Sequence, residues 1–275
     1  MTRIAVLQMT SGIAPADNAA AIVDAIREAK RGGAEMLFTP EMSGLLDRDR
    51  RRAQQNIAAE GDDRVLAAVR EAAAEQGIWV ALGSLAIALD GADDGARWAN
   101  RSFLVGPDGA IAARYDKMHM FDVDLSSGES WRESNAYRPG DAVVTAESPV
   151  GRLGLAICYD LRFPALFEAL GNAACDVIAV PAAFTVPTGR AHWHVLQRAR
   201  AIEASAFVVA AAQVGEHADG RRTYGHSLVV DPWGEVLLDM GGDDAGLGFA
   251  QIDRQRITDV RQQVPSLANR RKIPD

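Results

Sequence analysis

Residues 154–166 read GLAICYDLRFPAL, and this stretch changes character at Cys158. The apolar run before the cysteine is typical of a β-strand that is buried on both faces, as in α/β folds. Tyr159, Asp160 and Arg162 follow at once. In open α/β sheets ligands bind beyond the carboxyl ends of strands, so a strand that stops here would present its thiol where substrates gather. Taken alone, a cysteine is more often a small buried hydrophobic residue, which is our interpretation of Cys175.

Similar apolar runs recur along the chain and alternate with helical patterns. We expect further strands at residues 4–9, 36–40, 78–84, 176–183 and 206–213. Helices are predicted from Asp17 to Gly32, from Asp62 or Asp63 to Gly77, and from Arg190 to Ser205. Two hairpins are predicted at 102–115 and 227–238, with Pro-Asp-Gly and Asp-Pro-Trp-Gly turns. This alternation indicates an α/β fold. No Ser/Pro-rich linker divides the chain, so we expect one domain over 1–275, with a solvated tail at about 270–275.

One long segment, from about Asp122 to Asp141, interrupts this alternation. It is polar and Gly-rich and shows no periodicity, so we expect it to be a loop without regular structure. A long loop inside a compact domain is often functional. We therefore expect this segment near the mouth of a binding pocket.

Composition excludes several classes of protein. The formal net charge is −8 and the sequence pI is about 5.2, which argues against nucleic acid as a partner because phosphate binding needs a basic face. We find no apolar stretch of the roughly 18 residues that a membrane span needs and no signal-peptide pattern at the start. With only two cysteines in 275 residues, we expect a cytoplasmic location without disulfides.

Two more residues lie where chemistry is expected. Glu41 directly follows the predicted strand MLFTP, and Lys117 follows the first hairpin. A thiol that attacks an amide needs a base for its proton and a donor for the oxyanion. Glu41 and Lys117 can fill these roles, although each alone is more often a solvated surface charge.

Together with their neighbours, these residues resemble the nitrilase superfamily of carbon–nitrogen hydrolases. The matching stretches are LFTPEMSG (37–44), YDKMHMFDVD (115–124), GLAICYDLRFPAL (154–166), PTGRAHWHVLQRARAIE (187–203) and YGHSLVVDPWGEVL (224–237). The resemblance implies a four-layer α-β-β-α sandwich with a Glu–Lys–Cys triad and no metal or other cofactor. It also implies a homodimer or larger homo-oligomer.

Carried over residue by residue, the resemblance assigns the catalytic roles. Cys158 is expected to be the nucleophile, Glu41 the general base and Lys117 the stabiliser of the tetrahedral intermediate. Glu133, in the segment before the nucleophile strand, is expected to hold Lys117 and the substrate. The backbone N–H of Tyr159 is expected to be the second oxyanion donor.

Within the superfamily, the sequence resembles the branch that acts on deaminated glutathione and on ω-amides. A small carboxylated amide is therefore the expected substrate, with deaminated glutathione ahead of ω-amides such as 2-oxoglutaramate and of N-carbamoyl amino acids. An anionic substrate needs an arginine partner, and the candidates are Arg132, Arg138, Arg190 and Arg222. We expect His226 either on the pocket wall or as a core residue with its hydrogen bonds satisfied, and Arg162 in a structural ion pair.

Other functions stay open at this stage. Cys158 would pair with a histidine in a papain-like hydrolase, but no histidine lies in a stretch that resembles those enzymes. HMFDVD, with His119, Asp122 and Asp124, matches no metal-binding spacing. The non-enzyme alternative is a catalytically dead sandwich used as a binding module, which would be expected to have lost a triad residue.

Overall fold

Two six-stranded β-sheets form the framework of the protein. A computed structural model describes residues 1–89, 98–126, 128 and 130–271. The first sheet has the order β16-β1-β2-β3-β4-β5. Its strands are β16 (Gly246–Ile252), β1 (Thr2–Gln8), β2 (Met36–Phe38), β3 (Trp79–Ala88), β4 (Trp98–Val105) and β5 (Ile111–Asp116). The second sheet has the order β15-β14-β11-β10-β9-β8. Its strands are β15 (Val236–Asp239), β14 (Leu228–Val230), β11 (Phe207–Ala210), β10 (Val177–Ala179), β9 (Gly151–Leu155) and β8 (Thr145–Ser148).

The two sheets share one pattern. In each, three central strands run parallel, β1-β2-β3 in the first sheet and β9-β10-β11 in the second. One antiparallel strand flanks each trio on one side and two flank it on the other. The carboxyl ends of the parallel strands are therefore available for a site in both sheets.

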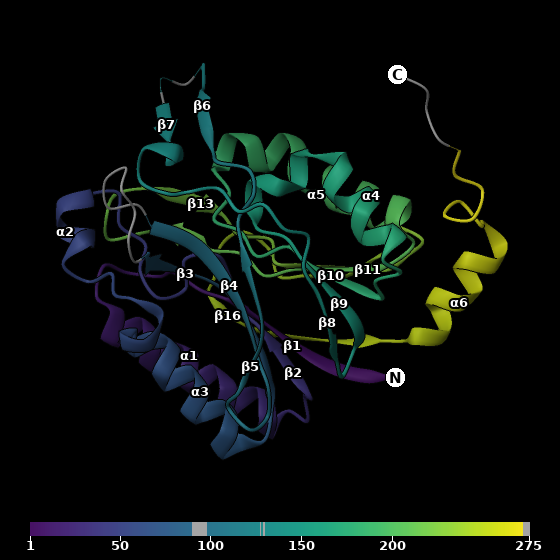
Figure 1. Cartoon of the computed structure of the whole chain (residues 1–275), viewed down its shortest axis with the longest axis horizontal. Helices are drawn as coiled ribbons and strands as arrows, with labels where there is room; N and C mark the ends of the chain where they lie inside the picture. Colours follow the sequence, from purple (N-terminus) through teal and green to yellow (C-terminus); the bar gives the residue numbers. More distant parts are fainter. Residues whose placement is uncertain (90–97, 127, 129, 272–275) are drawn as a thin grey trace.

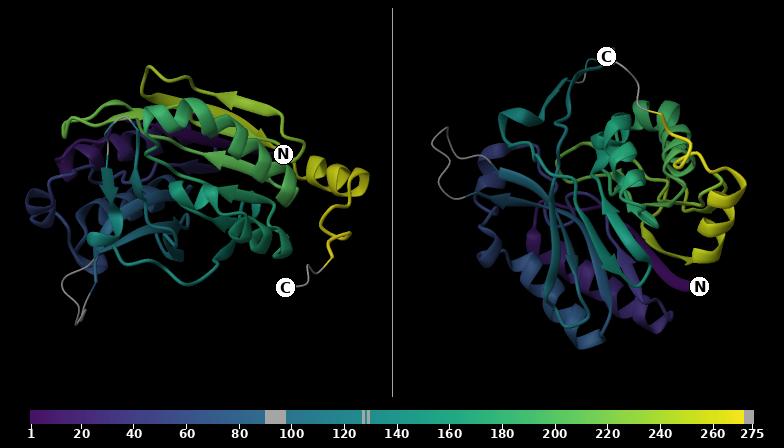
Figure 2. Two further views of the ribbon diagram at one scale, coloured as in Figure 1. Left: turned by 90° about the horizontal axis from the view of Figure 1, so that it is seen from above. Right: turned by 45° about the vertical axis from the view of Figure 1, so that its right-hand side comes forward.

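Helices cover the outer faces, so the molecule has four layers in the order α-β-β-α (Figures 1 and 2). On the first sheet lie α1 (Pro15–Arg31) and α3 (Arg64–Gln76); on the second lie α4 (Pro164–Asn172) and α5 (Val186–Ala204). The short α2 (Arg50–Gln54) and α6 (Arg254–Gln263) lie at opposite ends of the molecule (Figure 1). No helix among the residues placed in the structure has the length and apolarity to cross a membrane.

Strand β1 shows why its central residues 4–7 are all apolar. Ile4 and Val6 belong to the cluster between the sheets, whereas Ala5 and Leu7 pack against the α1–α3 layer. Successive side chains of a strand point to opposite faces. Both faces of the strand are covered along residues 4–7, which favours an apolar side chain at each of these positions.

Most predicted elements are confirmed, with shifts at helix starts. We predicted that α1 begins at Asp17, but it begins at Pro15, whose fixed φ suits the first helical turn. Similarly, α5 begins at Val186 and not at Arg190, with Pro187 in its first turn. Helix α3 begins after Asp63, whose side chain accepts a hydrogen bond from the Leu66 N–H (2.8 Å), as predicted.

The prediction of an irregular loop at 122–141 was wrong in part. This segment contains a hairpin of β6 (Asp122–Asp124) and β7 (Ser130–Arg132), followed by a 3₁₀ turn, η2 (Glu133–Asn135). An exposed hairpin needs no apolar alternation. Its polar side chains pair across the strands instead, with Arg132 Nη2 2.7 Å from Asp124 Oδ2.

Within the predicted tail, Arg270 is anchored to the body of the protein. Arg270 donates to the backbone oxygens of Glu168 (3.1 Å) and Glu203 (3.0 Å), near the carboxyl ends of α4 and α5. A cation is favourable there because the last carbonyls of a helix lack intrahelical partners. Residues 272–275 lie outside the described part of the chain.

Candidate functional site

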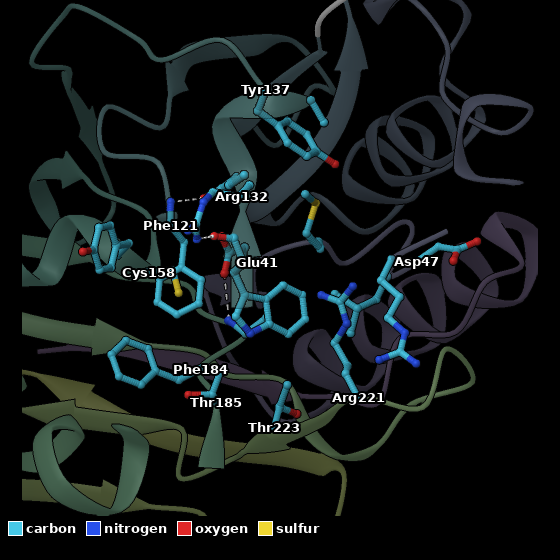
Figure 3. Close-up of a pocket in the computed structure, with 18 of the residues that line it drawn as sticks. Glu41, Asp47, Phe121, Arg132, Tyr137, Cys158, Phe184, Thr185, Arg221 and Thr223 are labelled. Atoms are coloured by element: carbon cyan, nitrogen blue, oxygen red, sulfur yellow. Dashed lines mark hydrogen bonds between the residues drawn. The ribbon is translucent and has the colours of Figure 1, made fainter. Parts of the chain in front are cut away.

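Four segments meet at the carboxyl ends of the parallel strands, between the two sheets. Glu41 lies three residues after β2, Lys117 directly after β5, Cys158 three residues after β9, and Glu133 in η2. Figure 3 shows Glu41 and Cys158 side by side in the wall of one pocket. Because β2 and β9 belong to different sheets, the packing of the sheets brings these two side chains together.

The chain between β2 and Glu41 is held by close contact with β3. A Cβ at Gly83 would lie 2.1 Å from the Thr39 oxygen, so only glycine allows this approach. The Gly83 N–H donates to Thr39 Oγ1 at 2.9 Å. Glu41 therefore leaves the sheet from a defined position.

Glu41 is buried, with 4% of its surface exposed, and both of its carboxylate oxygens accept hydrogen bonds. Oε1 accepts from Lys117 Nζ at 3.0 Å and from Asn100 Nδ2 at 2.9 Å. Oε2 accepts from the Ala183 N–H at 2.8 Å. The Cys158 thiol is close enough to this carboxylate for each group to shift the pKa of the other.

Lys117 is clamped between two carboxylates. Its ammonium lies 3.0 Å from Glu41 Oε1 and 2.9 Å from Glu133 Oε2, and 2% of the residue is exposed. Asn100 joins the same network, because its amide also donates to Glu133 Oε1 at 3.1 Å. The Phe121 N–H holds the other oxygen of Glu133 at 2.7 Å. This network orients the lysine toward the thiol and prevents it from turning to solvent.

The electrostatics indicate the protonation states of the resting site. Burial disfavours the charged form of Glu41, but the Lys117 ammonium and the hydrogen bonds outweigh it, so the pKa of Glu41 is lowered. Burial opposes the charge of Lys117 as well, yet Glu133 and Glu41 raise its pKa well above the ordinary value. Burial and the Glu41 charge raise the pKa of Cys158 well above its usual value. The resting site therefore holds a carboxylate, an ammonium and a neutral thiol.

The backbone at Cys158 is shaped as a sharp turn. Cys158 has φ 48°, a left-handed conformation that is uncommon for residues other than glycine, and it opens the 3₁₀ helix η3 (Cys158–Arg162). Its N–H donates to the Pro181 oxygen at 2.9 Å. The N–H of Tyr159 makes no hydrogen bond within the described residues. This is expected in the first turn of a helix, whose N–H groups have no intrahelical acceptor.

Asp160 stabilises this turn through the hydrogen bonds of its side chain. It is fully buried, and its Oδ2 accepts from the Ile157 N–H (2.9 Å) and the Tyr115 hydroxyl (2.7 Å). Its Oδ1 lies 2.7 Å from His119 Nδ1. The stretch that follows the cysteine thus ties the nucleophile strand to the segment that carries Lys117.

The thiol opens into a pocket of about 1310 Å³, larger than the roughly 300–1,000 Å³ of common small-molecule sites. Arginines line it from several elements: Arg48, Arg50, Arg132, Arg190, Arg221 and Arg222. Within the described part of the chain, Arg48, Arg190 and Arg222 make no ion pair, whereas Arg132 pairs with Asp124 and Arg221 with Asp219. In Figure 3, Arg221 lies on the opposite side of Glu41 from Cys158, so the arginine side of the pocket extends away from the thiol.

Three residues do not lie where we expected them. Arg138 is exposed and lies outside the pocket lining, because its backbone turns away after pairing with Trp98. His226 also lies outside the lining, and its Nδ1 faces Asp239 Oδ1 at 2.8 Å. Arg162 forms no ion pair among the placed residues; its guanidinium stacks over the rings of Tyr159 and Phe184.

Sequence reasoning missed Asn100 and Arg221. Asn100 is buried in strand β4, where the polar residues Arg101 and Ser102 follow it directly, so no local pattern singled it out. Arg221 lies next to the predicted Arg222, with its guanidinium 5.1 Å above the ring of Trp131. No sequence pattern marks that contact, because hairpin β6–β7 supplies the tryptophan.

The residues of HMFDVD do not gather into a metal site. His119 is held by Asp160, Asp122 by Ser134, and Asp124 by Arg132. Across the described ranges, one group has metal-ligating side chains close enough to share an ion: His194, His226 and Asp239. It lies outside the pocket lining.

Known proteins match this chain along almost its whole length. The family model described as carbon–nitrogen hydrolase matches residues 3–262. A deaminated glutathione amidase of Yersinia enterocolitica is 39% identical, over 98% of this chain and 93% of its own length. The human deaminated glutathione amidase is 37% identical, over 98% of this chain and 82% of its own. The crystal structure of the C. elegans NitFhit protein superposes with a TM-score of 0.89 at 35% identity; the match covers 98% of this chain and 65% of that one.

Proposed function

Because the chain belongs to the carbon–nitrogen hydrolase family, we propose that it is an amidase that hydrolyses deaminated glutathione through a thioester on Cys158. One observation carries the chemistry. A neutral thiol, a carboxylate with a lowered pKa and a buried ammonium are assembled in the wall of a pocket lined by arginines. A protein used only for binding has no need of this costly burial of charge.

Acylation begins with the proton of the Cys158 thiol. Because the thiol is neutral at rest, the sulfur becomes nucleophilic only as Glu41 takes its proton, while the S–C bond to the amide carbonyl forms. The carbonyl oxygen gains a negative charge. Lys117 and the unpaired N–H of Tyr159 are the donors that stabilise it.

The C–N bond then breaks. An amide nitrogen leaves poorly as an anion, so Glu41 returns its proton to that nitrogen as the bond opens. The amine departs and the acyl group stays on Cys158 as a thioester. Glu41 is then ionised again and takes a proton from a water molecule that attacks the thioester, which releases the carboxylic acid and the thiol. Glu133 and Asn100 hold Lys117 and Glu41 in position during both acylation and hydrolysis of the thioester.

The pocket supports an extended anionic substrate. Deaminated glutathione is a tripeptide analogue with a carboxylate at each end, and a cavity of about 1310 Å³ has room for it. Arg48, Arg190 and Arg222 bring charge that no carboxylate of the described chain neutralises. An arginine binds a carboxylate with two parallel hydrogen bonds when the geometry allows. A net negative protein with unpaired arginines in its pocket is therefore suited to such a ligand.

The substrate is tested by comparing kcat/KM for deaminated glutathione, 2-oxoglutaramate, an N-carbamoyl amino acid and a simple nitrile. We expect the first to be the best substrate. A higher value for 2-oxoglutaramate or for the N-carbamoyl compound would refute the substrate assignment and leave the thioester chemistry intact.

The role of the arginines has a matched control within the chain. Arg190→Ala and Arg222→Ala should raise KM for deaminated glutathione and leave the hydrolysis of a neutral amide unchanged. Arg138→Ala removes an equally exposed arginine outside the pocket and should change neither. If all three variants raise KM alike, a general loss of positive charge explains the effect and the pocket arginines have no specific role.

A further inference from the structure

A second cluster of reactive side chains lies outside the catalytic pocket. His194 comes from α5, His226 precedes β14, and Asp239 ends β15. Asp239 Oδ2 lies 3.0 Å from His194 Nε2, and its Oδ1 lies 2.8 Å from His226 Nδ1. The three side chains are 34%, 25% and 34% exposed, so an ion in solution can reach them.

The backbone holds this cluster in place. His226 has φ 54°, and its left-handed conformation is kept by the bond from its N–H to the Gly241 oxygen (2.7 Å). Its own carbonyl accepts from Trp193 Nε1 at 2.8 Å, which ties it to the residue next to His194 on α5. The ring of Tyr224 stacks on the His226 ring at 4.4 Å. These contacts fix the imidazole before any ligand arrives.

The carboxylate of Asp239 is held in one orientation by three contacts. Oδ2 faces His194 Nε2, and Oδ1 faces both His226 Nδ1 and the Gly241 N–H. The Gly241 N–H donates a hydrogen bond to Oδ1 at 2.9 Å, which fixes the rotation of the carboxylate. Both oxygens therefore face the imidazoles.

We propose that His194, His226 and Asp239 bind a divalent transition metal of the zinc class, with water as the fourth ligand. Two imidazoles and one carboxylate are ligands that Zn²⁺ accepts, and an exposed site of three protein ligands leaves a position for water. The ligand atoms all lie within 4.8 Å of one another. Neighbouring ligands of a tetrahedral zinc lie ~3.4 Å apart. The carboxylate therefore has to withdraw slightly from each imidazole, and a pair of ligand atoms near the 4.8 Å limit has to move closer together.

Metal binding replaces protons in this arrangement. The ion takes the place of the two hydrogens between Asp239 and the imidazoles, and His194 and His226 then carry their protons on the ring nitrogens that face away. No electrons are transferred, and the ion does not contact Cys158. Its effect is to fasten α5, whose first turns line the pocket, to β15 and to the segment before β14.

The test measures metal binding directly, without activity. Untagged protein carrying Cys158→Ala is used, because the catalytic thiol is itself a soft metal ligand. The protein is freed of metal with a chelator and titrated with Co²⁺, whose visible bands intensify in a four-coordinate site. Zn²⁺ then competes, and equilibrium dialysis gives the stoichiometry. His194→Ala and Asp239→Asn remove ligands, and His192→Ala is the matched control on the same helix.

We expect one metal ion per chain in the background protein and in His192→Ala. His194→Ala and Asp239→Asn should weaken binding by more than the about 10–100-fold that loss of an outer-shell partner costs. Far-UV circular dichroism identifies any variant that fails to fold. If His194→Ala fails to fold, the affinity of Asp239→Asn decides the test, because this substitution keeps the size and shape of the side chain. Absence of saturable binding in the background protein, or equal affinity in His192→Ala and Asp239→Asn, overturns the proposal.

Discussion

Replacement of Glu41 by glutamine tests the catalytic assignment most directly. The change keeps the shape of the side chain but turns one oxygen into an NH₂ group. Both oxygens of Glu41 face donors: Oε1 faces Lys117 and Asn100, and Oε2 faces the Ala183 N–H. Either orientation of the amide therefore places N–H against N–H in a buried site. The substitution removes the base and also leaves a donor without its acceptor.

The two effects have separate magnitudes. A buried donor left unsatisfied costs about 1–3 kcal/mol, so the free energy of unfolding of Glu41→Gln should fall by that amount. Loss of a general base typically costs about 10²–10⁴-fold in rate. Because the pKa of the Cys158 thiol is raised, no ready thiolate compensates, and the rate of acylation should fall by at least that factor.

Rapid-quench mass spectrometry measures the rate at which the acyl adduct forms on Cys158, and urea unfolding measures stability. Glu147→Gln is the control, because this carboxylate lies on β8 with 76% of its side chain exposed. It should match the wild type in both assays. Acylation of Glu41→Gln at nearly the wild-type rate would refute the assignment of Glu41 as the base, and wild-type stability would refute the reasoning about donors.

Three further predictions follow from the same site. Cys158→Ala should abolish turnover and Cys175→Ala should spare it; rapid iodoacetamide labelling of Cys175 that parallels loss of activity would contradict this. Lys117→Arg keeps the charge but not the compact ammonium between two carboxylates, so kcat should fall steeply; a near wild-type kcat would argue against the oxyanion role. Since the pKa of Glu41 is lowered by folding, the unfolded chain takes up the proton first on acidification. The stability from Glu41 is therefore full above its unfolded value of 4.5 and is lost as pH falls through the lower folded value. Urea midpoints measured across that range should show less of this loss in Glu41→Gln than in the wild type.

The sequence was sufficient for the fold class and for most elements. Continuous apolar runs predicted strands covered on both faces, and β1, β2, β3, β10 and β11 lie where those runs are. Such patterns are local, because the side chains of one strand respond to the two faces of one sheet. Local patterns did not predict the hairpin β6–β7, because its residues are exposed and need not alternate between apolar and polar.

The stretches around Glu41, Lys117 and Cys158 also directed attention to the right strand ends. Glu41 and Cys158 each follow an apolar run and Lys117 follows a predicted hairpin, so each was expected at the end of a strand. The pattern of apolar residues along the chain does not show which strand ends of the two sheets face one another. Glu41 and Cys158 belong to different sheets, and only the packing of those sheets places them in one pocket.

Tertiary structure alone decided the remaining contacts. Asn100 bridges two glutamates because β4 runs beside them, and Arg190 and Arg222 reach the pocket while Arg138 does not. His226, for which the sequence left a place on the pocket wall or in the core open, faces Asp239 and His194. These contacts join residues far apart in sequence, and their geometry depends on how whole layers pack. Periodicity reports the environment of a residue, whereas the partner of a side chain is set by long-range packing.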